Sequence, residues 1–281
     1  MEFLEVVGTR RSIRWFKSWE AVSRAQVQEI LEVVRHTTCP GNLQPWRAIV
    51  VYRDELDDET RDILLAAGNW QGAHVQSPVW IYWYADEEAA YPQEFATNTH
   101  LLCDVGALPA AYGWSKQRID EAIFKAMEAP EGMFSINEML HELPREASAM
   151  VAHAETVGAC AVACLAAVNL GLGTCLHIIS KGTKLEGVNK VLGVPSTFIP
   201  VYIQLVGHPA EAMEAGGQRP RFGFDKLYCE GKWGNPLRRE EAVVERMVEE
   251  KLIQPSAPLP NRFEELKFLA RMYGYPEVQE G

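Results

Sequence analysis

Three arginines and a serine stand close together near the start of this 281-residue chain, as Arg10, Arg11, Ser12 and Arg14. Arginine presents a planar fork of N–H donors that matches phosphate, and a serine hydroxyl adds another hydrogen bond. The chain as a whole is acidic, with 27 Lys and Arg against 38 Asp and Glu. The cluster is therefore a local feature, either a solvated charge run at a helix end or a site for an anion such as a phosphate.

A second group of polar side chains directly precedes a predicted buried strand. Asn42 and Gln44 stand in the stretch Gly-Asn-Leu-Gln-Pro-Trp, residues 41–46. An amide side chain carries both donors and an acceptor, so it can pair with the edge of a heterocycle. The alternative is that this stretch is only a capped turn.

A glycine-rich stretch, Asn-Leu-Gly-Leu-Gly-Thr-Cys at 169–175, joins a predicted helix to a predicted strand. A dinucleotide-binding fingerprint needs the opposite order, with a strand, a glycine loop and then a helix. Glycines that follow a helix are typical of a C-cap. We therefore interpret these residues as a tight connection and not as a dinucleotide site.

No motif for a catalytic nucleophile, a catalytic metal or a P-loop is present in the sequence. The six cysteines form no C-x-x-C pair, and Cys160 and Cys164 have no second Cys or His pair nearby to complete a zinc site. We interpret them as small buried side chains in a reducing compartment, and we expect no metal.

The net charge of −11 disfavours binding to nucleic acid or to an acidic membrane surface. The longest apolar stretch, 151–172, contains His153, Glu155 and Asn169, which argue for a buried helix and against a membrane span. The N-terminal residues do not have the pattern of a signal peptide. These features indicate a cytoplasmic protein.

The elements that must position these groups follow from periodicity and from turn residues. Strands are predicted over 48–52, 78–84, 175–179 and 199–206. Helices are predicted over 2–8, from a capping box at Ser23 and Gln26 onward, and over 57–67, 97–114, 145–170, 185–192, 240–252 and 262–272. Residues 118–146 contain two prolines and a glycine, which predict short helices and a mobile excursion.

Taken together and in their order, five segments resemble the FMN-dependent nitroreductase family over about residues 2 to 227. The segments are RRSIRWF, GNLQPWR, AVNLGLGTCLHI, LGVPSTFIPVYIQLVGHPAE and RPR. The resemblance implies an α+β fold, with a mostly antiparallel central sheet surrounded by helices, in an intertwined homodimer. It implies an FMN-binding domain over 1–228, with a substrate lid at 115–146. The helical extension 229–281 is expected to pack on the partner subunit.

The resemblance also assigns roles to individual residues. The FMN phosphate and ribityl chain are assigned to Arg10, Arg11, Ser12 and Arg14, and the phosphate also to Arg219 and Arg221. The flavin ring is assigned to Cys39, Pro40, Asn42 and Gln44. The flavin atoms N5 and O4 are assigned to the backbone N–H groups of Leu176, His177 and Ile178. Phe124 and Phe134 are candidates for stacking on a substrate or for ordinary packing. The family usually shows Pro-Ser-x-x-Asn where this chain has Thr38 to Asn42. His177 is unusual, and is either a core histidine or a proton donor or substrate anchor.

The implied activity is that of an FMN-dependent oxidoreductase. NADH or NADPH would reduce the flavin and leave, and an electron-poor acceptor (a nitroaromatic, quinone or activated alkene) would then take the hydride by a ping-pong mechanism. Because the flavin carries the chemistry, no catalytic side chain is required. Two alternatives stay open. One is a same-scaffold enzyme for oxygen-dependent dehydrogenation, reductive dehalogenation or flavin breakdown, and the other is a flavin-binding protein without turnover.

Overall fold

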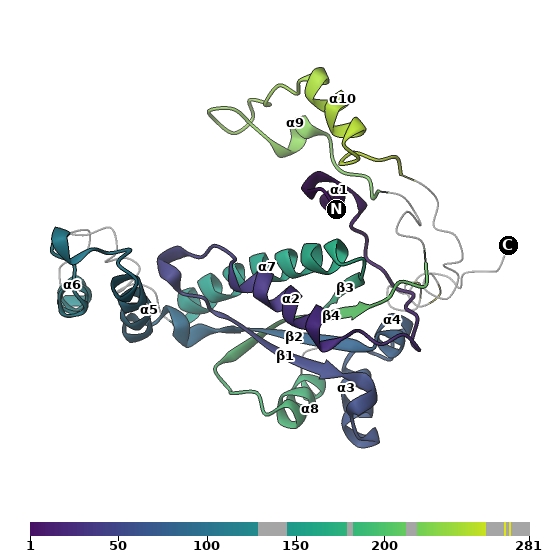
Figure 1. Ribbon diagram of the computed structural model, residues 1–281, viewed down its shortest axis with the longest axis horizontal. Coiled ribbons are helices and arrows are strands. Elements are labelled where there is room, and N and C mark those ends of the chain that lie inside the picture. Colours follow the sequence, from purple (N-terminus) through teal and green to yellow (C-terminus); the bar gives the residue numbers. More distant parts are fainter. Residues whose placement is uncertain (129–144, 179–181, 212–217, 257–266, 268–269, 271–281) are drawn as a thin grey trace. The chain divides into compact units, whose positions relative to one another are not determined.

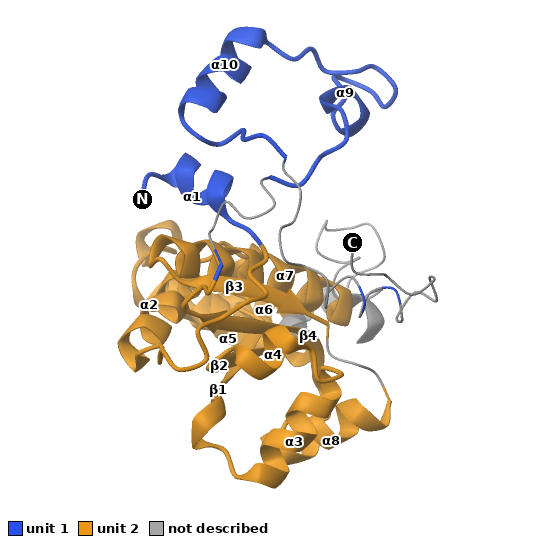
Figure 2. Ribbon diagram, turned by 90° about the vertical axis from the view of Figure 1, so that its right-hand side faces the viewer, with its two compact units in different colours: residues 1–11, 211–281 blue, residues 12–210 orange. Residues whose placement is uncertain are grey.

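The computed structural model describes residues 1–128, 145–178, 182–211, 218–256, 267 and 270 (Figure 1). These residues form two compact units (Figure 2). One unit is Ser12–Ala210, and the other combines Met1–Arg11 with Glu211–Gly281. The first unit holds the sheet, and the second joins the N-terminal helix to the C-terminal part of the chain.

The Ser12–Ala210 unit is built on a four-stranded antiparallel sheet with the order β1-β2-β4-β3. The strands are β1 (Trp46–Tyr52), β2 (Val79–Asp86), β3 (Gly173–His177) and β4 (Phe198–Gly207). Every residue of β2 is buried, which fits its run of aromatic and β-branched side chains. The four predicted strands are confirmed, and so is the mostly antiparallel α+β architecture.

Two helices cover one face of this sheet, α2 (Arg24–Arg35) and α7 (Arg145–Asn169) (Figure 1). The predicted capping box at Ser23 and Gln26 opens α2. Ala159 and Ala163 of α7 are fully buried, because small side chains on this face let the helix lie close to the sheet, whereas Ala154 and Ala161 are exposed. In the described part of the chain, Ser148–Asn169 is the one helical segment long and apolar enough to cross a membrane. Its packing against α2 and the sheet is that of a core helix.

The other face of the sheet carries α3 (Asp58–Ala67), α4 (Gly72–Gln76) and α8 (Thr183–Leu192) (Figure 1). Side chains alternate along a strand, so Trp80, Tyr82 and Tyr84 of β2 point to this face. The Tyr84 hydroxyl is 3.1 Å from Asn189 Oδ1 on α8, and Trp80 lies edge-on to His74 of α4. The predicted α3 and α8 are confirmed, whereas α4 has only five residues and was not predicted.

Helices α5 (Pro92–Asp104) and α6 (Lys116–Glu128) pack together around Ala96, Ile119 and Ile123. The prediction of one helix over 97–114 is wrong in its bounds. The helix starts earlier, because Pro92 suits a first helical position. It ends at Asp104, and Gly106 then adopts a φ of 73° ahead of Pro109. Of the excursion predicted over 118–146, residues 118–128 belong to the single helix α6 and residues 129–144 lie outside the described residues.

The second unit contains α1 (Phe3–Thr9), α9 (Phe224–Leu227) and α10 (Glu241–Glu249) (Figure 2). Helix α1 contacts the stretch after α10, where the Lys251 ammonium is 3.0 Å from Glu5 Oε1. A Cβ on Gly8 would lie only 2.0 Å from the Lys251 carbonyl oxygen, so this close approach requires glycine. The predicted α1 and α10 are confirmed, and the predicted helix over 262–272 lies almost entirely outside the described residues.

Candidate functional site

Residues 12–14, here called the basic segment, run beside β3 in the sheet-containing unit. Ser12 forms a parallel bridge with Thr174, and the Ile13 amide donates to the Thr174 carbonyl oxygen at 3.0 Å. Ile13 is almost fully buried, and a Cβ on Gly173 would lie 2.9 Å from its side chain. This anchoring leaves Ser12 and Arg14 half-buried at the edge of the sheet, next to the residues that follow Thr174 on β3.

His177, the last residue of β3, is buried, and its Nδ1 has no hydrogen-bond partner among the described residues. Burial lowers its pKa to about 4, and the positive charge of nearby Arg14 acts in the same direction. The imidazole is therefore neutral near pH 7. Ile178 directly follows and is strongly exposed. The end of β3 thus combines a cation, a neutral imidazole and an open surface.

Two more buried polar groups lie on the same side of the sheet as His177. Both ring nitrogens of His74 and the Tyr82 hydroxyl are buried and have no hydrogen-bond partner in the part of the chain that the structure describes. The His74 and His177 rings are 6.4 Å apart. Burial lowers the pKa of His74 to about 3, with His177 as the second cause, and burial raises the pKa of Tyr82. We refer to His74, Tyr82 and His177 as the buried polar cluster.

His74 and Tyr82 were not among the predicted site residues. Tyr82 on β2 is opposite Ile203 on β4, and Ile203 is opposite His177 on β3. The side chains of Tyr82 and His177 therefore lie in one row on the same face of the sheet. The alternation of β2 could have placed Tyr82 on that face. No signal in the sequence marks His74, because its burial depends on how α4 packs against Trp80.

The residues 40–44, here called the amide loop, precede β1. Pro40–Asn42 form a short 3-10 turn, and Gly41, Asn42 and Gln44 have φ values of 55°, 58° and 46°. The left-handed conformation is costly for a non-glycine residue and persists only where the surroundings hold it. Gln44 Nε2 donates to Asn42 Oδ1 at 3.1 Å, and the Gln44 amide donates to Cys39 Sγ at 3.4 Å. The two side-chain amides are therefore held in a defined arrangement.

The amide loop is fixed to the sheet through Arg47 of β1. Arg47 Nη1 donates to the Gln44 carbonyl oxygen at 2.8 Å, and Arg47 Nη2 is 2.7 Å from Asp86 Oδ2. The Asp86 amide in turn donates to the Pro45 carbonyl oxygen at 2.8 Å. These contacts position the loop at the start of β1 on the outer edge of the sheet.

The two groups of predicted site residues lie at opposite edges of the sheet. Ser12, Arg14 and the end of β3 belong to one edge, and the amide loop precedes β1 at the other. Three strand spacings separate these edges, which is about 14 Å. A single copy of this unit therefore does not bring the basic segment and the amide loop into contact.

The other predicted arginines belong to the second unit. Arg11 is buried, and its guanidinium donates to the Gly8 carbonyl oxygen at 2.6 Å and to Gln254 Oε1 at 3.0 Å. Arg10 is half-buried, and Arg219 and Arg221 are exposed. Phe124 lies within α6, and Phe134 lies outside the described residues.

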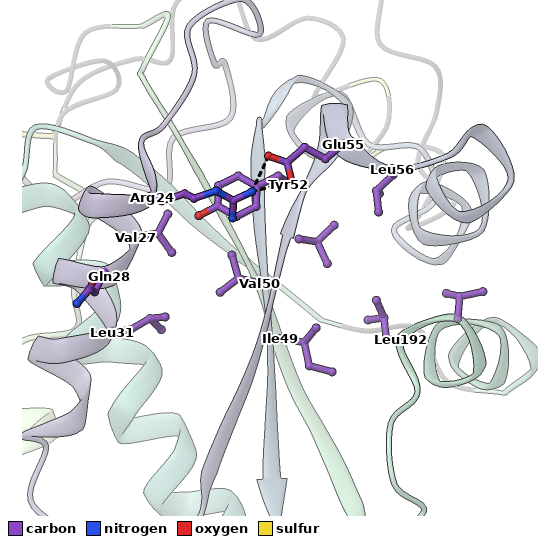
Figure 3. A pocket seen from close by; sticks show the side chains of 12 residues that line it. Arg24, Val27, Gln28, Leu31, Ile49, Val50, Tyr52, Glu55, Leu56 and Leu192 are labelled. Carbon is purple, nitrogen blue, oxygen red and sulfur yellow. Dashed lines mark hydrogen bonds and ion pairs between the residues drawn. The ribbon is translucent and has the colours of Figure 1, made fainter.

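A groove of about 630 Å³ lies elsewhere, along the outer edge of β1 (Figure 3). Apolar side chains of α2, β1 and α8 form most of its wall, and the Arg24–Glu55 ion pair, at 2.8 Å, lies at one end of it. None of the predicted site residues lines this groove. It is therefore separate from the residues expected to bind a cofactor.

The donor set fits a ligand with a phosphate and a polar heterocycle. Arginine and serine beside β3 suit a phosphate, and the ordered amides of Asn42 and Gln44 suit a ring that has both donors and acceptors. No group of three or more His, Cys, Asp or Glu side chains with the geometry of a metal site occurs among the described residues.

Two sequence comparisons find similar proteins. The profile of the nitroreductase family matches residues 7–208. An NADH dehydrogenase from Thermus thermophilus is 30% identical over 203 residues, which cover 72% of this chain and 84% of that protein.

Solved structures show the same fold. A proposed nitroreductase from Exiguobacterium sibiricum in complex with FMN is 19% identical, with a TM-score of 0.61, and the match covers 81% of this chain and 96% of that one. A proposed NAD(P)H:FMN oxidoreductase from Staphylococcus epidermidis is 18% identical, with a TM-score of 0.59 and coverages of 81% and 94%. B. megaterium NfrA2 is 17% identical, with a TM-score of 0.54, and the match covers 100% of this chain and 88% of that one.

Proposed function

Because this chain belongs to the nitroreductase family, we propose that it is an FMN-dependent oxidoreductase that uses NADH or NADPH. The observation that carries the proposal is the placement of Ser12 beside Thr174 on β3 and of Arg14 near His177 at the end of that strand. When bound, FMN accepts a hydride from the nicotinamide and passes it to a second, electron-poor substrate. We propose a nitroaromatic, a quinone or an activated alkene as that substrate.

In this proposal the residues of the chain bind and orient the flavin. Arg14 and Ser12 hold the phosphate and the ribityl chain, and Asn42 and Gln44 face the polar edge of the ring. The backbone N–H groups near Leu176 to Ile178 donate toward N5 and O4. Separate donors aimed at N1 and O2 of the ring would stabilise the negative charge of the reduced flavin, as an oxyanion hole stabilises an alkoxide.

The neutral state of His177 has a consequence for this arrangement. A second cation beside Arg14 would raise the local positive charge, whereas the lowered pKa of His177 keeps its ring uncharged near pH 7. The pKa of about 4 also makes a cationic proton donor scarce at neutral pH. We propose that His177 contributes its backbone and a neutral ring, and that the proton for the reduced substrate comes from water.

We further propose a cytoplasmic homodimer in which each flavin contacts both chains. The basic segment and the amide loop lie at opposite edges of one sheet, so a second copy is needed to place an amide loop against a given Arg14. The extension 229–281 has apolar residues and a stiff Pro-rich stretch at 255–260, and the groove along β1 is an apolar surface beside a strand with an open edge. We propose that the extension wraps the neighbouring subunit.

The purified protein tests the oxidoreductase proposal directly. It should carry a yellow flavin chromophore, and anaerobic addition of NADH or NADPH should bleach it. Addition of a quinone or a nitroaromatic should then restore the oxidised spectrum. Absence of flavin, or a flavin that neither nucleotide reduces, would contradict the proposal. Turnover that requires oxygen would instead indicate oxygen-dependent chemistry on the same scaffold.

A further inference from the structure

Helix α5 contacts the amide loop through two side chains three residues apart, which therefore share one face of the helix. Asn98 Nδ2 donates to the Leu43 carbonyl oxygen at 3.3 Å, and Asn42 Nδ2 donates to the Asn98 carbonyl oxygen at 3.3 Å. The Phe95 ring packs on Gly41, where a Cβ would lie 2.3 Å from Phe95 Cε2. One face of α5 thus makes two hydrogen bonds and one close packing contact with the loop.

These contacts determine how the loop can present its amides. Asn42 gives a side-chain N–H to Asn98, while its Oδ1 accepts from Gln44 Nε2. The loop has left-handed backbone at Asn42 and Gln44, a conformation that needs support from outside the loop. Arg47 supplies that support on the sheet side, and Asn98 supplies it on the α5 side.

The rest of α5 is joined to α6. Ala96 packs with Ile119 and Ile123, and His100 Nε2 lies 2.8 Å from Asp120 Oδ1. Lys116 at the start of α6 is 2.6 Å from an Asp104 carboxylate oxygen. Helix α5 therefore connects α6 to the amide loop. A displacement of the α5–α6 pair of helices would be transmitted to the loop through Phe95 and Asn98.

We propose that Asn98 and Phe95 are positioning residues for the flavin site, acting through the amide loop. They hold Asn42 and Gln44 in the arrangement that meets the flavin, and they couple that arrangement to the α5–α6 pair. The flavin part of this inference rests on the proposed function. The effect on the loop itself does not require a flavin.

Hydrogen exchange of the full-length protein, as purified and after removal of flavin, tests the effect on the loop. Asn98→Ala removes the donor to Leu43, and Asn98→Asp keeps the shape but places an acceptor there. Loss of one such hydrogen bond should speed exchange of the Leu43 and Gln44 amides about two- to tenfold. Thr97→Ala is the matched control, because the exposed Thr97 hydroxyl donates within the helix, to the Gln93 carbonyl oxygen, and to no other residue that the structure describes.

The second measurement concerns the cofactor. Both Asn98 variants should bind FMN about two- to tenfold more weakly, with a shifted visible flavin spectrum and midpoint potential, while Thr97→Ala stays like wild type. Loop exchange equal to that of the Thr97 control in both variants would overturn the inference. Faster exchange with wild-type FMN affinity, spectrum and potential would overturn its flavin part. A wild-type protein that binds no FMN would refute the proposed function, and the exchange data would still decide the role of Asn98.

Discussion

Replacing His74 by phenylalanine should change how the stability of the protein depends on pH. His74 is fully buried, neither ring nitrogen has a hydrogen-bond partner among residues that the structure describes, and its pKa is lowered to about 3. An ordinary unfolded histidine has a pKa near 6.5. Above that pH both states are neutral and His74 adds no pH dependence. As the pH falls below about 6.5, the unfolded chain takes up a proton that the folded chain excludes, so folding stability is lost down to about pH 3.

The magnitude follows from the difference between the two pKa values. Each pH unit below 6.5 costs about 1.4 kcal/mol for one such histidine, so lowering the pH from 7.5 to 5.0 should cost about 2 kcal/mol through His74. His177, with a folded pKa of about 4, adds a similar loss over the same interval. The pair therefore accounts for about 4 kcal/mol of acid destabilisation.

Denaturant unfolding at pH 7.5 and 5.0 measures this effect. His74→Phe keeps an aromatic ring against Trp80 and removes two unsatisfied nitrogens, so at pH 7.5 it should be as stable as wild type or more stable. On acidification it should lose about 2 kcal/mol less than wild type. His36→Gln, which removes an exposed histidine, is the control for the loss of one histidine. If the wild-type and His74→Phe stabilities fall in parallel between the two pH values, His74 is not a buried neutral group and the reasoning is wrong.

Three other predictions concern the cofactor and the assembly. Arg14→Ala should weaken FMN binding about tenfold or more, since one charge-assisted contact with a phosphate is lost. Equilibrium dialysis measures the FMN affinity, and an unchanged affinity would show that Arg14 is not part of the site. Mass spectrometry of the released flavin should identify FMN and not FAD, because the sequence has no strand–glycine loop–helix motif for a pyrophosphate. Sedimentation at micromolar concentration should show a flavin-loaded dimer, and a stable flavin-loaded monomer would refute it. The expected interface is above about 2,000 Å², and removal of 229–281 should weaken the dimer.

The local elements that the sequence specifies most strongly were predicted well. The capping box at Ser23 and the aromatic, β-branched run of β2 depend on neighbouring residues alone, and the structure confirms both. The bounds of α5 were predicted poorly, because residues 105–114 retain apolar side chains after the helix has ended. The turn there depends on Gly106 and Pro109, whose effect a periodic pattern does not register.

The buried polar cluster could not be predicted, because burial of His74 is a property of the tertiary packing. The residue belongs to a five-residue helix with no amphipathic pattern. Its ring fits only because Gly68 has no side chain, since a Cβ there would lie 2.2 Å from His74 Nδ1. Glycine at the end of α3 has an obvious local interpretation as a helix terminator. Its second role, which is to make room for a ring from the next helix, becomes visible only in three dimensions.

The candidate site shows a similar division between sequence and structure. The arginine cluster and the amide pair were found from residue types and spacing, and the family profile covers both segments. Their positions relative to each other depend on the strand order β1-β2-β4-β3, which puts the segment before β1 and the segment beside β3 at opposite edges. A single copy therefore keeps the two segments about 14 Å or more apart across the sheet. The proposal that two chains share each flavin rests on the resemblance, and the dimer prediction tests it.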